Sequence, residues 1–312
     1  MRAVTLVDGR VEVRDHPDPE PGAGELLIRI RSAGLNNADL AQRAGMYPAP
    51  SGSPQDIPGL ELAGEVAAVG PQVFRYSVGD RVMAIVGGGG QASLAVLHER
   101  VAIPVPEGLS WGEAGGFPEA YFTSYDALFS QCNLSVGERL LVTGAAGGVG
   151  VAAVQLGVAA GARVVASVRD PARRDDVAAF GAEVVAPDDH LAHGPYDVVL
   201  EMFPKHNLAT DVEALATGGR IHIVSSVGGT RAEFNVSGLM RVRGRIHGSS
   251  LRSRPLEAKA SVSRAVESHV LPLLGAGRVT VPVCATFGLE EAGQAYERFV
   301  AGHKLGKIVL EP

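Results

Sequence analysis

Cysteine is scarce in this chain of 312 residues, and the scarcity excludes several kinds of protein. The two cysteines, Cys132 and Cys284, are too few and too far apart for a disulfide framework or a four-cysteine metal site. A chain of this length buries about three quarters of its unfolded surface, so it needs no crosslinks for stability. The low cysteine content is typical of a reducing compartment, and we expect a cytoplasmic protein.

Long apolar runs and blocks of basic residues are missing as well. No apolar run reaches the length of about 18 residues that a transmembrane helix needs, and residues 3–7 read as a strand rather than as part of an export signal. The 28 basic and 34 acidic residues give a formal net charge of −6 at pH 7. No Lys/Arg cluster could neutralise a phosphate backbone. We therefore expect neither a membrane nor a nucleic acid as a partner.

Glycine, by contrast, is abundant, with 40 residues, and the punctuation that it provides divides the chain. Over residues 1–118, short apolar runs alternate with Gly and Pro, which predicts a turn-rich, mostly β domain. Over residues 119–255, apolar strands alternate with alanine-rich helical stretches, which predicts a parallel sheet. Residues 256–312 begin with a helical pattern and end in a strand. The predicted fold class is α/β, with a mostly β domain and a doubly wound domain.

A glycine-rich loop follows the predicted strand at residues 140–143 and opens a helix that runs to about Ala160. This order of strand, loop and helix is typical of a dinucleotide site. Small residues let the backbone approach a pyrophosphate, and the helix N-terminus attracts its negative charge. The alternative is a helix start that only packs tightly against its strand. The loop is Gly144-Ala145-Ala146-Gly147-Gly148-Val149-Gly150, and we expect cofactor contacts from Ala146, Gly147, Gly148, Val149 and Gly150.

The next predicted strand ends in Ser167-Val168-Arg169 and is followed by Arg173, where NAD-binding sites carry an acidic residue. Arginine forks match a 2′-phosphate, whereas a carboxylate repels it. We therefore predict NADPH as the cofactor, with contacts from Ser167, Arg169 and Arg173. The alternative is that these arginines only form the solvated start of a helix.

Several motifs together carry a resemblance to a known family. The chain resembles the medium-chain dehydrogenase/reductase superfamily over nearly its whole length, specifically the zeta-crystallin type of NADPH:quinone oxidoreductases. The resemblance implies a GroES-like catalytic domain, a Rossmann domain, a cofactor between the two, and a C-terminal segment that returns to the first domain. It also implies a homodimer that pairs a strand near Ile246 of each copy. The motifs are Gly34-Leu35-Asn36-Asn37-Ala38-Asp39, Pro58-Gly59-Leu60-Glu61-Leu62-Ala63-Gly64, Val78-Gly79-Asp80-Arg81-Val82, the glycine loop, and residues 197–202 and 306–310.

The resemblance also bears on metal binding. Zinc alcohol dehydrogenases of the superfamily ligate a catalytic ion at the positions that align with Asn36, Leu60 and Glu119. A leucine cannot ligate zinc, an amide does so poorly, and the cysteine-rich lobe that holds a structural zinc is missing. We therefore predict no metal. The chemistry that remains is direct hydride transfer from NADPH to an electron-poor small molecule such as a quinone or an enone.

Three residues align with family positions beside the nicotinamide and are the candidate catalytic residues. Tyr47 aligns with a tyrosine that related enoyl thioester reductases are proposed to use as a proton donor, and a phenol with an ordinary pKa of about 10 is a feasible acid. Tyr47 could equally pack over the cofactor without donating a proton. Asn36 either hydrogen-bonds a carbonyl of the substrate or nicotinamide, or forms a turn. Thr123 lies near the nicotinamide, caps its helix, or does both.

Two strand ends and a loop complete the predicted site. By the same resemblance, Ser225 and Ser226 should face the cofactor, as should Ser249 and Leu251, although the latter could be plain strand residues. The four glycines at 87–90 align with a loop at the mouth of the substrate cleft, or they form a flexible surface turn. The predicted activity is zinc-independent reduction of a quinone by NADPH. The alternatives are reduction of a 2-enoyl thioester or alkenal with Tyr47 as proton donor, and a non-catalytic, crystallin-like NADPH-binding protein.

Overall fold

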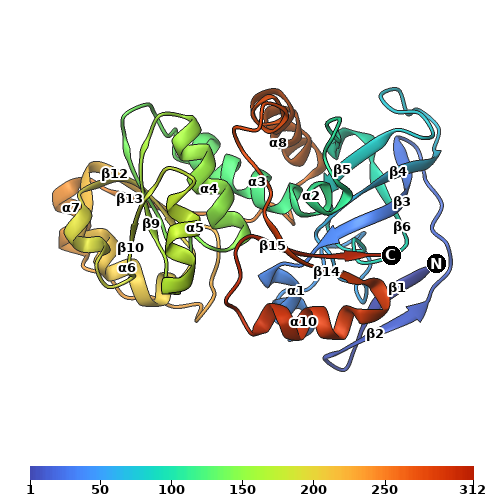
Figure 1. The fold of residues 1–312 in the computed structure, drawn as a ribbon, viewed down its shortest axis with the longest axis horizontal. Coiled ribbons are helices and arrows are strands. Elements are labelled where there is room, and N and C mark those ends of the chain that lie inside the picture. The colour runs from blue at the N-terminus through green and yellow to red at the C-terminus, as the bar shows by residue number, and fades with distance from the viewer.

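Two sheets lie side by side along the long axis of the molecule and organise residues 1–312 of the computed structural model (Figure 1). The sheet on the left of the figure has six strands in the order β10-β9-β8-β11-β12-β13, and every pairing in it is parallel. The sheet on the right has seven strands and is mostly antiparallel. This arrangement confirms the predicted α/β fold, with a GroES-like part and a Rossmann part.

The parallel sheet is built from strands that alternate with helices. Leu140, Leu141 and Val142 of β8 are all fully buried, as expected for a central strand that helices cover on both faces. β13 forms one edge of the sheet, and the self-pairing expected near Ile246 stays a prediction. The strands are β8 (Arg139–Val142), β9 (Arg163–Ser167), β10 (Glu183–Val185), β11 (Tyr196–Glu201), β12 (Leu215–Ile223) and β13 (Arg245–Gly248). The helices are α4 (Gly148–Ala159), α5 (Arg174–Ala178), α6 (Pro204–Glu213) and α7 (Val236–Val242).

The seven-stranded sheet combines strands from both halves of the chain. Its order is β14-β15-β3-β4-β5-β7, and β6 pairs with β3. Leu26, Ile28 and Ile30 of β3 are buried while the residues between them are not, which is the period of two that a strand with one buried face shows. The strands are β3 (Glu25–Gly34), β4 (Glu61–Val69), β5 (Arg81–Ile85), β6 (Leu94–His98), β7 (Ala102–Pro104), β14 (Val283–Gly288) and β15 (Lys307–Glu311).

Helices join the two sheets into one body. α2 and α3 lie between the sheets in Figure 1. Phe117 and Phe122 belong to one apolar cluster with Met83 of β5 and with Leu140 of β8, so the two sheets share a core. None of the helices is both long and apolar enough to span a membrane. The helices outside the parallel sheet are α1 (Asn37–Arg43), α2 (Trp111–Gly116), α3 (Pro118–Tyr125), α8 (Leu256–His269), α9 (Leu271–Gly275) and α10 (Ala292–Val300).

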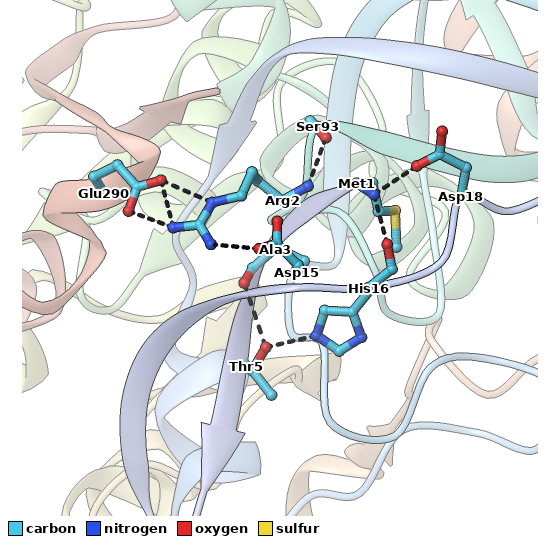
Figure 2. A network of polar contacts seen from close by, with 9 residues as sticks. All are labelled: Met1, Arg2, Ala3, Thr5, Asp15, His16, Asp18, Ser93 and Glu290. Atoms are coloured by element: carbon cyan, nitrogen blue, oxygen red, sulfur yellow. Dashed lines mark hydrogen bonds and ion pairs between the residues drawn. The ribbon is translucent and has the colours of Figure 1, made fainter.

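A separate hairpin of β1 (Arg2–Val7) and β2 (Arg10–Asp15) is held to the second sheet by polar contacts (Figure 2). The Arg2 guanidinium donates to both carboxylate oxygens of Glu290, each at 2.8 Å. The backbone N–H of Arg2 donates to Ser93 Oγ at 3.1 Å, and Thr5 Oγ1 shares a hydrogen bond of 2.8 Å with His16 Nε2. The Arg2–Glu290 pair thus ties the first strand to the turn that precedes α10.

Candidate cofactor and substrate site

The glycine loop lies between β8 and α4, as the sequence predicts. Gly144 has a φ of +60°, in the left-handed region that favours glycine. A Cβ on Gly150 would lie 2.4 Å from the carbonyl oxygen of Gly144 and 2.6 Å from Ala145 Cα, so only glycine fits there. Gly147 is the N-cap of α4 and offers no side-chain hydrogen bond. The first N–H groups of a helix have no intrahelical partner, so those of α4 are available to an anion.

The end of β9 contacts the glycine loop and is followed by the two arginines that the sequence analysis selected. The carbonyl of Ser167 accepts a hydrogen bond of 3.2 Å from Ala145 N. Arg169 is exposed on the following turn, whereas Arg173 pairs with Asp176 at 2.9 Å. Both arginines lie near this strand end, but only Arg169 has no partner in the chain.

Asp170 directly follows Arg169, so an acid that the sequence analysis missed is present at this turn after all. Its Oδ1 accepts from Ala172 N at 3.0 Å and its Oδ2 hydrogen-bonds His303 Nδ1 at 2.8 Å. These bonds, that from His303 first, hold the pKa of the Asp170 carboxyl below its usual range. An Asp before Pro-Ala is a capping pattern, and this signal in the sequence could have revealed the role of Asp170 as the N-cap of a short helical turn.

Two further strand ends meet at the same edge of the parallel sheet. Ile223 and Gly248, the last residues of β12 and β13, are paired. Ser225, half-buried, accepts from Val227 N at 3.2 Å. Ser249 Oγ shares a hydrogen bond of 3.0 Å with His222 Nε2. Because the carboxyl ends of parallel strands lie along one edge, the structure brings these residues to the side of the sheet that carries the glycine loop. Ser226, exposed, follows Ser225, and Leu251, buried, follows β13.

Tyr47 connects this edge to the other sheet. It lies in the loop after α1, and its phenol shares a hydrogen bond of 2.9 Å with Ser250 Oγ. The side chain is half-buried. The contact places the phenol at the end of β13, beside the predicted cofactor residue Ser249.

The four-glycine loop is packed and is not a free surface turn. Gly88, Gly89 and Gly90 are buried. A Cβ on Gly88 would lie 2.9 Å from the carbonyl oxygen of Pro54, and a Cβ on Gly90 would lie 2.6 Å from that of Glu61. The interpretation as a flexible turn is therefore wrong, because glycine is needed here for close approach of backbone.

A buried polar network includes Asn36, one of the three positions that align with zinc ligands of the zinc enzymes. The Lys307 ammonium lies 2.5 Å from Glu61 Oε1 and donates to Asn36 Oδ1 at 2.7 Å. Asn36 Nδ2 in turn donates to Glu61 Oε1 at 2.9 Å. Leu60 is buried and offers no donor atom. The side chain of Asn36, the N-cap of α1, is thus engaged with Lys307 and Glu61, and its predicted contact with a carbonyl of the substrate or nicotinamide stays a prediction.

This donor set does not fit a zinc ion. The amide oxygen of Asn36 accepts from the Lys307 ammonium, Leu60 has no ligand atom, and Glu61 is paired with Lys307, so Glu119 alone among the three aligned positions has a carboxylate oxygen without a partner. Among residues 1–312, no group of three or more His, Cys, Asp or Glu side chains is placed to hold a metal ion.

Glu119 lies in the first turn of α3 beside this network. Its backbone N–H donates to Glu61 Oε2 at 2.8 Å, and its own Oε2 is buried without a hydrogen-bond partner. Burial, followed by the nearby Glu61 carboxylate, raises the pKa of Glu119 to about 8, while Lys307 acts in the opposite direction. Burial thus favours the protonated, neutral form of the Glu119 carboxyl. The sequence indicated Glu119 only as a position that binds metal in relatives.

Thr123 lies one turn after Glu119 on the same helix. α3 begins at Pro118, so the interpretation of Thr123 as a helix cap is wrong. Residues four apart share a helix face, which places Thr123 beside Glu119.

Comparisons with known proteins agree with this geometry. The sequence model described as the alcohol dehydrogenase GroES-like domain matches residues 22–107, and that of the zinc-binding dehydrogenases matches residues 148–267. The quinone oxidoreductase of Lama guanicoe is 30% identical over 329 residues, covering 99% of this chain and 97% of that protein. The quinone oxidoreductase of Pseudomonas aeruginosa is 29% identical and covers 97% and 95% of the two chains.

A solved structure gives the same result. The quinone oxidoreductase of Thermus thermophilus, known with and without NADPH, is 32% identical and superposes with a TM-score of 0.85 over 100% of both chains. With these similarities and the fold described above, the chain belongs to the medium-chain dehydrogenase/reductase superfamily, among the proteins that resemble quinone oxidoreductases.

Proposed function

We propose that this oxidoreductase uses NADPH to reduce quinones or related conjugated carbonyl compounds, and that it does so without zinc. The observation that carries the proposal is the combination of a dinucleotide loop with the closed Lys307–Glu61–Asn36 network at the zinc positions. Without a Lewis acid to polarise an alcohol, the reaction must rely on an acceptor that takes a hydride readily. The relatives named quinone oxidoreductases support this choice of acceptor.

The residues that would hold the cofactor lie along the carboxyl edge of the parallel sheet. The glycine loop fits a pyrophosphate, because Gly150 lets the loop fold tightly and the start of α4 offers free N–H groups. Ser167 and Arg169 would contact the adenosine ribose, and Ser225, Ser226, Ser249 and Leu251 would lie towards the nicotinamide. When bound, NADPH supplies the hydride. Tyr47, Thr123 and Glu119 would then line the acceptor side, and Tyr47 and Glu119 can each deliver a proton.

Replacing Arg169 with serine tests the choice of NADPH over NADH. Arg169 is exposed and has no partner in the chain, so its guanidinium is free to bind a 2′-phosphate. We expect the Kd for NADPH to rise by about tenfold, the effect of losing one charge-assisted contact, with the Kd for NADH unchanged. Titration of nicotinamide fluorescence with both cofactors measures the two constants. Equal losses for both cofactors, or wild-type protein that prefers NADH, would contradict the proposal.

The neutral Glu119 and the half-buried Tyr47 phenol favour a second candidate, reduction of 2-enoyl thioesters or alkenals. Such a reaction needs a proton delivered to carbon, whereas the two oxygens of a reduced quinone can take protons from water. With Tyr47→Phe we expect kcat for an enoyl thioester to fall by about 100-fold and kcat for 1,4-benzoquinone to fall far less. Full kcat with both acceptors would remove the acid role of Tyr47.

The same assay separates the candidate functions. NADPH oxidation by the unsubstituted enzyme is measured with a panel of quinones, enones and enoyl thioesters. The proposal expects the highest kcat/KM with a quinone. A preference for thioesters would support the second candidate, and tight NADPH binding without turnover on any of these acceptors would indicate the non-catalytic, crystallin-like protein.

A further inference from the structure

Arg252 is an unusual buried cation at the junction of the two sheets. It lies between β13 and α8 and is only 3% exposed. Its guanidinium donates to the carbonyl oxygens of Gly87 at 2.7 Å and Tyr47 at 3.1 Å, and to Gln42 Oε1 at 2.6 Å. All three acceptors are neutral and belong to the other lobe. Burying a guanidinium whose hydrogen-bond acceptors are all neutral has an unfavourable free energy. Such a residue is therefore a candidate for a functional role.

The three acceptors of Arg252 belong to a helix and two loops of the other lobe. Tyr47 lies in the loop after α1, Gln42 lies in α1 itself, and Gly87 starts the packed four-glycine loop. The guanidinium carbon also lies 5.1 Å from the centre of the Tyr47 ring, within the range of a cation–π contact. One side chain thus fixes both the backbone and the ring of Tyr47 and joins its loop to the four-glycine loop.

Arg252 is itself held at its own backbone. Lys259 of α8 donates to the carbonyl oxygen of Arg252 at 3.2 Å, and the preceding Leu251 is buried. Burial lowers the pKa of Arg252, while the charges of Asp39, Tyr47 and Glu119 act in the opposite direction. Asp39, Tyr47 and Glu119 lie near Arg252, as does the like-charged Lys259, and Tyr47 and Glu119 would line the proposed acceptor side.

From this geometry we infer that Arg252 is a positioning residue, which acts on the reaction by fixing Tyr47 against Ser250 at the end of β13. The inference rests on the proposed reductase activity for its kinetic consequence, but its structural consequence is independent of any substrate. A lysine would not reproduce these contacts, because Arg252 bonds its three acceptors from three different nitrogens of a planar fork, whereas an ammonium donates from a single atom.

The structural test is amide hydrogen exchange with the full-length protein. In Arg252→Met we expect residues 44–50 and 87–90 to exchange at least about tenfold faster, while β8 and α4 keep their protection. Arg220→Met is the control, because Arg220, within β12 and away from Tyr47, also donates to backbone carbonyls, those of Cys132 and Asn133, and in addition pairs with Glu138. It should destabilise the protein without changing exchange at residues 44–50. Unchanged protection there in Arg252→Met would overturn the inference, whether or not the protein reduces quinones.

The kinetic test uses NADPH with 1,4-benzoquinone. We expect Arg252→Met and Arg252→Lys each to lower kcat by about tenfold, because the ring and loop of Tyr47, which Tyr47→Phe retains, would no longer be held in place, and to change KM by less than about threefold. In a Tyr47→Ala background, Arg252→Met should cause almost no further loss of kcat, because the group that it positions is gone. Wild-type kcat in Arg252→Lys, or additive losses in the double variant, would overturn the positioning role. Absence of turnover by the unsubstituted enzyme would contradict the proposed function instead, and the exchange experiment alone would then decide the role of Arg252.

Discussion

Replacing Lys307 with methionine will lower the free energy of unfolding by about 3–5 kcal/mol, the usual cost of leaving one partner of a buried ion pair alone. The Lys307 side chain is 4% exposed and that of Glu61 is not exposed at all. Methionine has nearly the same volume, so the loss comes from the charge and not from a cavity. Glu61 would remain beside Glu119 and Asp39 without its cation. Urea denaturation followed by circular dichroism at neutral pH measures the change.

The double variant Glu61→Gln/Lys307→Met is the control for this result. Removing both charges takes away the unpaired carboxylate, so the double variant should recover more than half of the lost stability. A loss below about 1 kcal/mol in the single variant would mean that the pair is solvated like a surface ion pair, against its burial in the structure.

Gly150→Ala is expected to abolish NADPH binding and to cost about 3 kcal/mol of stability, at the upper end of what overpacking causes. The added Cβ meets backbone atoms, the Gly144 oxygen at 2.4 Å and Ala145 Cα at 2.6 Å, and these cannot move aside as a flexible side chain could. The loop must open to accept the methyl group, and the N–H groups at the start of α4 then lose their arrangement. Thermal unfolding and fluorescence titration with NADPH measure the two effects.

Two other glycines provide matched comparisons. A Cβ on Gly147 would have only the Gly144 oxygen nearby, at 3.4 Å, so Gly147→Ala should cost about 1 kcal/mol as an N-cap change while still weakening NADPH binding. A Cβ on Gly293 of α10 would meet nothing within 4 Å, so Gly293→Ala should leave NADPH binding unchanged. Wild-type affinity for NADPH in Gly150→Ala would show that the loop does not bind the pyrophosphate.

The parts of the site that local sequence determines could be predicted, and the parts that depend on distant contacts could not. The glycine loop lies within a single unit of strand, loop and helix. The sequence of that unit alone therefore predicts both its structure and its role. The Lys307–Glu61 pair joins residues 246 positions apart, and nothing in either segment indicates the other. The contacts of Arg252 with Gln42, Tyr47 and Gly87 could not be predicted for the same reason.

Two other differences have local causes. The prediction at the end of β9 considered the arginines and overlooked Asp170. The position of Asp170 directly before Pro171 is typical of the start of a helical turn. The cap expected at Thr123 assumes a helix that starts too late, whereas α3 already begins at Pro118. The four glycines at 87–90 are a further case of contacts distant in sequence, because the segment that packs on them, residues 49–61, cannot be recognised from the four glycines themselves.

The way β15 joins β3 has a consequence for the folding of the chain. β3 pairs with β4 and β6, which are close to it in sequence. It also pairs with β15, and the whole Rossmann unit lies between these two strands in the sequence. Lys307 and its acceptor Leu35 are 272 positions apart. Contacts between residues so far apart in sequence form slowly. The entropy of closing the long loop is lost before the strand pairing can stabilise the fold. The parallel sheet should therefore gain its structure early in refolding, and the seven-stranded sheet, in which β15 brings Lys307 to Asn36, should be completed last.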